Sequence, residues 1–152
     1  LLAQAVRPLM KQSGGGSIVN VASRVYLAGT GVAYTSSKSG LIGLTRVLAV
    51  QLGPDNIRVN AVAPWFLNTP FNEKIVTENA GLAASFRKMS PLGRLGTAED
   101  VAGAIAFLAS PRASFITGDV IHVCGGTQLA PQPDAAGVEH NQPEPDGRSA
   151  IN

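Results

Sequence analysis

The sequence has few residues of several kinds, and each scarcity excludes a class of protein. Cys124 is the single cysteine among 152 residues, which excludes a disulfide framework and a cysteine zinc cage. The two histidines, His122 and His140, share no metal-ligand spacing with it, so no metal site is predicted. No uncharged apolar run approaches the roughly 18 residues of a membrane span, so we expect no transmembrane helix.

Charge and targeting signals are equally scarce. The net charge of +2 is too small to indicate nucleic acid or an anionic membrane as a partner. Leu1 opens a segment that is typical of a helix, without the charged region and cleavage site of a signal peptide. We therefore expect a cytoplasmic protein. A chain that begins within a helix is also expected to lack an upstream part.

What the sequence does contain is an alternation of strand and helix signals. Apolar residues make up 45% of the chain, which suits one globular domain. The expected strands are 17–22, 57–63 and 119–124, and the expected helices are 1–12, 33–52 and 97–109, with further helical segments from 70 to 90. This order predicts parallel strands joined by crossover helices, and hence an α/β layered fold.

Local signals set the expected boundaries of these elements. Residues 14–16 are glycines and predict a flexible break, and residues 23–32 are expected to form a loop. Gly53 followed by Pro54 predicts a helix end with a left-handed residue at Gly53. Thr97 is expected to open a capping box.

Two helices show an apolar stripe that is expected to face the core. In the helix over 33–52 the large members of this stripe are Leu41, Leu44, Leu48 and Leu52. In the helix that ends near Ala109 they are Val101, Ile105 and Leu108.

Residues 129–152 differ in composition from the rest of the chain. They hold four prolines, four acidic residues and one arginine, and almost no large apolar side chain. Such a segment cannot bury a core, so a Pro-rich, disordered tail is expected there.

The strongest candidate site is Tyr34 with Lys38, one helical turn further along. At this spacing both side chains stand on the same face of a helix. A phenol ordinarily has a pKa near 10, so a tyrosine that transfers protons needs a positive charge nearby. One ammonium about 4 Å away, at an effective dielectric constant of about 20, supplies about 4 kcal/mol, which is sufficient. The alternative is a surface tyrosine that packs on a lysine stem.

Ser23 directly follows the first expected strand and precedes Tyr34 by eleven residues. Ligands of open parallel sheets bind at the carboxyl ends of the strands. A hydroxyl at this place can polarise a substrate oxygen that also faces the Tyr–Lys pair. The alternative is a loop hydroxyl that satisfies backbone groups.

Further motifs accompany these residues along the chain. Together they occupy residues 18–23, 34–40, 58–64, 69–70, 91–94, 99–102, 107–110, 116–118 and 125–126. In this order and spacing they resemble the short-chain dehydrogenase/reductase family, and the resemblance covers residues 1–128. It implies a partial Rossmann-like, doubly wound parallel sheet, of which this chain holds the three C-terminal strands with their flanking helices.

The resemblance implies an NAD(P)-dependent oxidoreductase that interconverts an alcohol and a carbonyl, with NAD or NADP as the cofactor. Tyr34 is then expected to be the general acid or base, and Ser23 to hold the substrate oxygen. Lys38 is expected to stabilise the phenolate and, with Tyr34, to contact the nicotinamide riboside. The loop that is expected to lie under the nicotinamide contains Pro64, Trp65, Leu67 and Thr69.

The chain departs from the family pattern at three places. Trp65 stands where the family has glycine, and its indole either narrows the site or turns toward the substrate pocket. The spacing of eleven between Ser23 and Tyr34 is shorter than the commoner thirteen. The glycine-rich turn that binds the pyrophosphate is missing, because residues 14–16 lie between a helix and a later strand.

The missing turn implies a fragment that carries the catalytic and nicotinamide half of the domain. We expect the 152-residue chain by itself to be inactive, and turnover with any nicotinamide cofactor would refute this. The alternative is a non-catalytic remnant or pseudo-enzyme that keeps only an oligomerisation surface. A third reading is an α/β domain whose motifs are accidental.

The resemblance also bears on partners. One side of the helix over 33–52 carries small residues, namely Ala33, Ser36, Ser37, Ser39, Gly40 and Gly43. In the family this helix helps to build a homodimer, usually within a homotetramer, and the alternative is packing within the chain. The substrate is expected to be a small alcohol or carbonyl compound. Its fairly apolar character is suggested by the lid at 71–89 and by the neighbours Arg24, Tyr26, Trp65 and Phe66.

Two residues near the chain's last expected strand are assigned structural roles. Cys124 is expected to be a buried thiol, and His122 to lie within the strand without a part in the chemistry.

Overall fold

The computed structural model describes residues 2–28 and 31–129. Its centre is a sheet of three parallel strands, β1 (Gly16–Val21), β2 (Ile57–Pro64) and β3 (Val120–Val123). The strands lie in the order β1-β2-β3, so that each sequential pair is adjacent. The predicted α/β fold with parallel strands is confirmed. The predicted tail at 129–152 lies outside the described residues, apart from Leu129.

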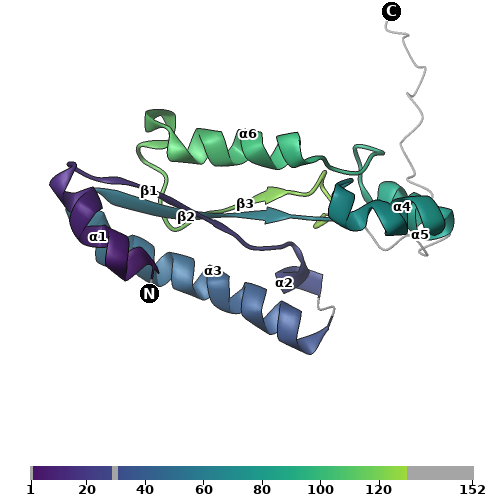
Figure 1. The fold of residues 1–152 in the computed structure, drawn as a ribbon, viewed down its shortest axis with the longest axis horizontal. Coiled ribbons are helices and arrows are strands. Elements are labelled where there is room, and N and C mark those ends of the chain that lie inside the picture. Colours follow the sequence, from purple (N-terminus) through teal and green to yellow (C-terminus); the bar gives the residue numbers. More distant parts are fainter. Residues whose placement is uncertain (1, 29–30, 130–152) are drawn as a thin grey trace, which may run out of the picture.

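Helices cover both faces of the sheet (Figure 1). Helix α6 (Ala98–Ala109) lies on one face, and α1 (Leu2–Gln12) and α3 (Val32–Leu52) lie on the other. The chain crosses one face of the sheet between β1 and β2 and the opposite face between β2 and β3, so three layers result. Within the described ranges, no helix has both the length and the apolarity to cross a membrane.

The remaining helical elements are short. Helices α4 (Glu73–Glu78) and α5 (Ala80–Met89) lie beyond the carboxyl ends of β2 and β3 (Figure 1). They confirm helical segments between residues 70 and 90. The other short elements are α2 (Val25–Ala28) and three 3-10 turns, η1 (Gly53–Asp55), η2 (Pro70–Asn72) and η3 (Pro111–Ala113).

The core lies on both sides of β2, which is buried along nearly its whole length. A central strand of a parallel sheet is covered on both faces, and β2 is accordingly apolar except for Arg58 and Asn60. On the α3 side Val59 packs with Leu48 and Leu52. On the α6 side Val62 packs with Leu108, among others.

The N-terminus of α6 has the expected capping box. The Thr97 hydroxyl accepts a hydrogen bond from the Asp100 N–H, and the Asp100 carboxylate accepts one from the Thr97 N–H. Two donors at the end of the helix are thereby satisfied. Val101 and Leu108 are buried and Ile105 packs against the same core, as predicted.

The prediction for α3 is wrong at Leu44. Its side chain is 49% exposed, and the buried stripe of this helix consists of Ile42, Thr45, Leu48, Ala49 and Leu52. Leu44 instead lies on an open side of the helix where Val47 and Val50 are also exposed. The predicted stripe was chosen from large apolar residues, whereas the buried face also includes the smaller Thr45 and Ala49.

The prediction for residues 23–32 is also incomplete, because the segment contains α2 in place of an unbroken loop. The predicted end of α3 is wrong in its geometry. Gly53 is right-handed (φ −53°), and the chain continues into η1. The left-handed residue is Asn56 (φ 57°), where a short polar side chain tolerates that conformation.

The glycines at 14–16 do not form a flexible break. A Cβ on Gly15 would lie 2.3 Å from the Asn56 carbonyl oxygen, and one on Gly16 would lie 2.2 Å from the Met10 methyl group. Gly16 is already part of β1, and its N–H donates to the Asn56 carbonyl. These glycines therefore permit close packing of α1 against the start of the sheet.

Candidate active site

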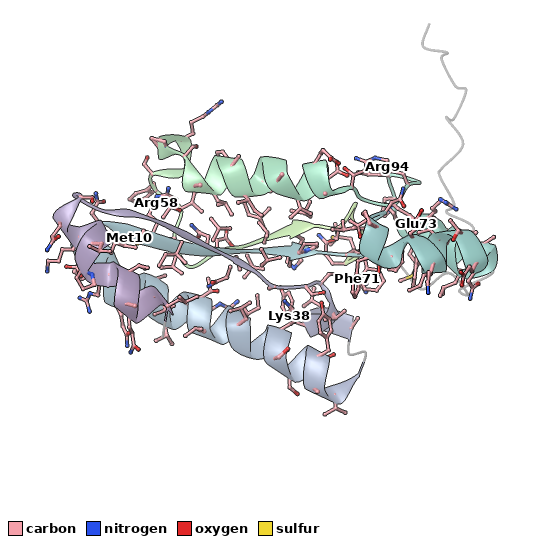
Figure 2. All side chains as sticks on the ribbon, viewed as in Figure 1. Met10, Lys38, Arg58, Phe71, Glu73 and Arg94 are labelled. Atoms are coloured by element: carbon pink, nitrogen blue, oxygen red, sulfur yellow. The ribbon has the colours of Figure 1, made fainter. Side chains whose placement is uncertain are left out.

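The predicted pair of Tyr34 and Lys38 lies in the N-terminal part of α3, which runs beneath the carboxyl end of β1 (Figure 2). The Lys38 ammonium lies 5.7 Å from the centre of the Tyr34 ring. It also donates a hydrogen bond of 2.9 Å to the carbonyl oxygen of Val21, the last residue of β1. Tyr34 is 50% exposed, so its phenol is accessible to a ligand. The two side chains thus share one face of the helix.

Ser23 lies two residues beyond the carbonyl that Lys38 binds. Backbone hydrogen bonds fix its neighbours to β2, because the Ala22 N–H donates to Val62 O and the Arg24 N–H to Pro64 O, both at 2.8 Å. Ser23 is 8% exposed, and its hydroxyl accepts a long hydrogen bond of 3.4 Å from the Val25 N–H. The alternative role of Ser23 was a loop hydroxyl that satisfies backbone groups. Such a contact is present, but at this distance it is a weak hydrogen bond.

The loop after β2 is held at the same end of the sheet. Pro64 is buried at the end of the strand, and the Trp65 N–H donates to Val123 O at 3.4 Å. Leu67 forms a parallel bridge with Gly96, and its carbonyl accepts from Asn72 Nδ2 at 2.9 Å. These bonds restrict the loop before any ligand is present.

Thr69 completes this loop as the N-cap of η2. It is partly buried, and its carbonyl accepts a hydrogen bond of 2.9 Å from the Asn72 N–H. The four predicted loop residues therefore lie in one segment that runs from the last residue of β2 to the N-cap of η2.

Arg24 is buried at this end of the sheet, which the sequence analysis did not predict. It is 7% exposed, its Cζ lies 4.5 Å from the centre of the Trp65 ring, and its Nη2 donates to Thr127 O at 2.7 Å. A sequence signal existed, since Arg24 directly follows Ser23. Its burial depends on Thr127, which is 103 positions away, and could not be predicted.

The Tyr26 hydroxyl lies 2.8 Å from His122 Nε2, and the two rings stack with centroids 5.7 Å apart. This contact joins α2 to β3 and gives His122 a structural partner. Cys124, at the end of the same strand, is buried and donates a hydrogen bond to the Gln128 side chain. The burial of Cys124 and the position of His122 within β3 are as expected from the sequence.

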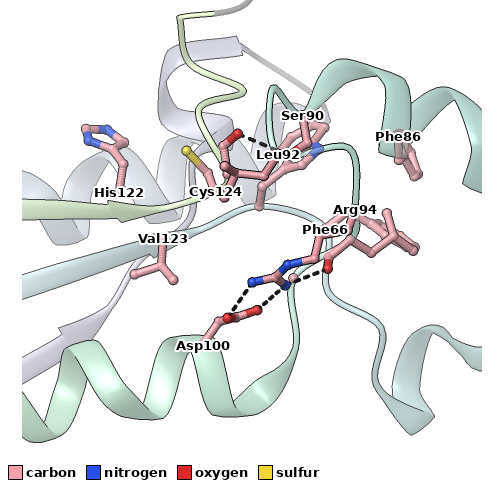
Figure 3. Close-up of a pocket in the computed structure, with 13 residues that line it drawn as sticks. Phe66, Phe86, Ser90, Leu92, Arg94, Asp100, His122, Val123 and Cys124 are labelled. Carbon is pink, nitrogen blue, oxygen red and sulfur yellow. Dashed lines mark hydrogen bonds and ion pairs between the residues drawn. The ribbon is translucent and has the colours of Figure 1, made fainter.

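A cavity of about 230 Å³ opens between the end of β3, the loop after β2 and α5 (Figure 3). Its apolar wall is formed by Trp65, Phe66 and Phe86, whose rings contact one another. Its polar lining includes His122 and the ion pair of Arg94 with Asp100. Ser23, Tyr34 and Lys38 are not among the residues that line this cavity, so the cavity does not contain the predicted catalytic residues.

The ion pair at the cavity is bidentate. Arg94 Nη1 and Nη2 donate to the two carboxylate oxygens of Asp100 at 2.6 and 2.8 Å. These bonds, together with the backbone N–H of Thr97, hold the pKa of Asp100 well below its usual range. Asp100 therefore joins the segment before α6 to the first turn of that helix.

This lowered pKa predicts how stability changes with pH. A carboxyl group whose pKa is lower in the folded state stabilises the fold fully above its unfolded pKa of about 3.9, and progressively less as the pH falls below that value. The midpoint temperature of thermal unfolding should be higher for the wild-type protein than for Asp100→Asn. This difference in midpoint should be largest at pH 6–7 and should shrink below about pH 4. Arg94→Met should remove most of the same pH dependence. A difference that stays constant down to about pH 2 would contradict the prediction.

Comparison with known proteins agrees with this architecture. A family model described as enoyl-(acyl carrier protein) reductase matches residues 1–128. The chain is 46% identical over 127 residues to the 3-oxoacyl-[acyl-carrier-protein] reductase of Thermotoga maritima, covering 82% of this chain and 50% of that protein. It is 41% identical over 130 residues to the (2S)-[(R)-hydroxy(phenyl)methyl]succinyl-CoA dehydrogenase subunit of Thauera aromatica, covering 85% and 51%. The chain thus spans about half the length of the curated relatives it matches.

Solved structures give the same result. A short-chain type dehydrogenase/reductase from Mycobacterium ulcerans superposes with a TM-score of 0.78 at 37% identity, over 88% of this chain and 49% of that one. ElxO, solved with NADP bound, superposes with a TM-score of 0.73 at 36% identity, over 81% and 50%. The match of the family model over residues 1–128, the sequence relatives and the shared fold all agree. The chain belongs to the short-chain dehydrogenase/reductase family.

Proposed function

We propose that the protein is an NAD(P)-dependent oxidoreductase that interconverts an alcohol and a carbonyl in a small-molecule substrate. The observation that carries this proposal is the Lys38 ammonium, 5.7 Å from the Tyr34 ring centre and bonded to the last carbonyl of β1. Parallel sheets bind ligands at this end of their strands. Membership of a family whose relatives include acyl reductases and dehydrogenases supports the same reaction class.

In the proposed reaction Tyr34 is the general acid or base. For carbonyl reduction its hydroxyl donates a proton to the substrate oxygen, and for alcohol oxidation its phenolate accepts one. In this proposal the positive charge of Lys38 stabilises the negative charge that develops on Tyr34 during proton transfer. Ser23 donates a hydrogen bond to the same substrate oxygen and so orients it toward Tyr34.

The donor set at this end of the sheet fits a nicotinamide dinucleotide, NAD or NADP. Val21 uses one of the three N–H donors of Lys38, and an ammonium with further donors suits ribose hydroxyls. In this proposal the backbone of Leu67 and the hydroxyl of Thr69 hold the carboxamide, with Pro64 and Trp65 beside the ring. The bound dinucleotide supplies or accepts the hydride. Support for NADP comes from the relative that was solved with it bound.

Lys38→Met tests this proposal directly in the protein expressed from its complete gene. Loss of the ammonium should lower kcat/KM for carbonyl reduction by about 10²- to 10³-fold, because a few kcal/mol of phenolate stabilisation disappear. The measurement is the consumption of NADH or NADPH with a panel of ketones and aldehydes.

Lys11→Met is the matched control for this experiment. Lys11 pairs with Asp55 at the opposite, amino-terminal end of the sheet, so its removal should leave kcat/KM within about twofold. Absence of turnover in the wild-type protein with every carbonyl and both cofactors would favour the non-catalytic alternative. Equal activity of Lys38→Met and wild type would refute the assigned role.

The oligomeric part of the proposal rests on the open side of α3. A Cβ added to Gly40 or Gly43 would meet no atom within 4 Å, so packing within the described chain does not explain these small residues. Leu44, Val47 and Val50 are exposed on the same helix. We infer a homodimer or homotetramer that buries this face, which sedimentation velocity of the complete protein would detect as a species larger than one chain. A cytoplasmic location, without nucleic-acid or membrane partners, stays a prediction.

A further inference from the structure

The most unusual polar cluster of the molecule surrounds Arg24. Among residues 2–28 and 31–129, the buried side-chain nitrogen and oxygen atoms without a hydrogen-bond partner are Arg24 Nε, Trp65 Nε1 and Thr127 Oγ1. These three residues also contact one another, because Arg24 stacks on the Trp65 ring and donates to the Thr127 carbonyl. Buried polar groups are ordinarily paired. Three unpaired groups in a single cluster therefore indicate a ligand.

The chemistry of the three groups selects the charge of that ligand. A guanidinium Nε–H and an indole N–H can only donate, and a threonine hydroxyl donates readily. Arg24 cannot lose its proton, so it remains a cation although it is 7% exposed. The ion pairs found in the described part of the chain involve Asp55 and Asp100, and neither of them pairs with Arg24. Arg24 is thus a buried cation whose contacts are a carbonyl oxygen and an aromatic ring, and an anion would balance its charge.

The place of the cluster connects this anion to the substrate. Arg24 is the next residue after Ser23, and its N–H is fixed to Pro64 O at the end of β2. An anion held by Arg24 would therefore lie at the same end of the sheet as the oxygen that Ser23 and Tyr34 are proposed to hold. A carboxylate fits best, because its two oxygens match the planar fork of a guanidinium.

We propose that Arg24, with Trp65 and Thr127, binds a carboxylate group of the substrate, so that the enzyme acts on hydroxy acids and oxo acids. This inference rests on the proposed function. The aromatic wall of Trp65, Phe66 and Phe86 accommodates an apolar part of the same molecule. The fairly apolar substrate expected from the sequence thus acquires one negatively charged end.

A binding experiment tests the site without any turnover. Trp65 is the one tryptophan of the 152 residues, and its emission should respond to an anion on Arg24. The protein from the complete gene is titrated with butanoate, butanamide and inorganic phosphate at constant ionic strength, and the signal of Trp65→Phe is subtracted. A saturable change with butanoate and none with butanamide is expected. No response to butanoate, or a response to phosphate alone, would overturn the inference.

A kinetic experiment then connects the site to catalysis. Reduction of 3-oxobutanoate and 4-oxopentanoate is compared with that of their methyl esters. The wild-type protein should prefer one of the acids over its ester by about tenfold or more in kcat/KM, because a charge-assisted bidentate pair is lost in the ester. Arg24→Met should abolish this preference and retain reduction of the ester, whereas the exposed Arg112→Met should keep the preference.

The outcomes separate this inference from the proposed function. If the wild-type protein reduces acid and ester equally well, the carboxylate site is refuted and the oxidoreductase assignment stands. If no carbonyl is reduced while Trp65 still binds butanoate, the carboxylate site is supported and the proposed function fails. The wild-type measurements decide both questions even if Arg24→Met does not fold.

Discussion

Tyr34→Phe should lower kcat/KM for carbonyl reduction by about 10²- to 10⁴-fold, equivalent to ~3–5 kcal/mol of transition-state stabilisation. The substitution removes the only proton that the side chain can transfer and keeps the aromatic ring next to Lys38. Affinity for NADH or NADPH should stay unchanged, because the ring and the ammonium both remain. Steady-state kinetics together with calorimetric titration of the cofactor measure these two effects separately.

Tyr26 provides the comparison for this result, since it is the other tyrosine of the chain. The Tyr26 hydroxyl contacts His122. In the described residues the ammonium that lies near a tyrosine ring is that of Lys38, which is near Tyr34. Tyr26→Phe should therefore reduce kcat/KM less than about tenfold, as expected when one hydrogen bond is lost. Retained activity in Tyr34→Phe, combined with a large loss in Tyr26→Phe, would assign proton transfer to Tyr26.

Asn60→Ala should lower the free energy of unfolding by roughly 2–4 kcal/mol, the largest effect on stability that we expect. Asn60 is fully buried in β2. Its Nδ2 donates to Ile116 O at 2.8 Å, and its Oδ1 accepts from the Asp119 N–H at 3.1 Å. Alanine removes both bonds, so the Asp119 N–H loses its side-chain acceptor and the Ile116 carbonyl keeps only the 3.5 Å bond from Arg58 Nη1.

Denaturant unfolding of the complete protein measures this loss, and an unchanged m-value would show that the unfolded state is unaffected. Asn68→Ala is the matched control, because the Asn68 side chain is exposed and its removal should cost less than about 0.5 kcal/mol. Equal stability of the two variants would mean that water replaces the lost partners of Asn60.

The sequence predicted the fold well because strong local signals agreed with its layered architecture. The strands, α3 and α6 were expected within about one residue of their observed ends, which is closer than such boundaries usually fall. The Thr97 capping box was recognisable because all of its groups lie within four residues. Local hydrogen bonds of this kind leave a pattern that can be read from the chain.

The errors arose where distant segments decide the outcome. Leu44 has the size of a core residue, but β2 contacts the neighbouring side of α3, where Thr45 and Ala49 are buried in its place. The turn after α3 was assigned to Gly53, although its left-handed residue is Asn56. Asn56 is held there by bonds to residues 14 and 16, which lie 42 and 40 positions earlier.

Some residues of the candidate site could be predicted from local sequence, and others could not. The positions of Tyr34 and Lys38 follow from helical spacing alone, and Ser23 follows from its place after a strand. The cluster around Arg24 could not be predicted, because it joins residues that follow three different strands. Its unpaired groups become visible only when those strand ends lie side by side.

The packed glycines after α1 have a practical consequence for protein engineering. A run of three glycines looks like a natural linker, and would be a first choice for inserting a tag or for a circular permutation. In this protein such an insertion would force apart the Asn56 carbonyl and the Met10 side chain, which lie against Gly15 and Gly16. Insertions should be better tolerated in an exposed turn that lies against no neighbouring backbone.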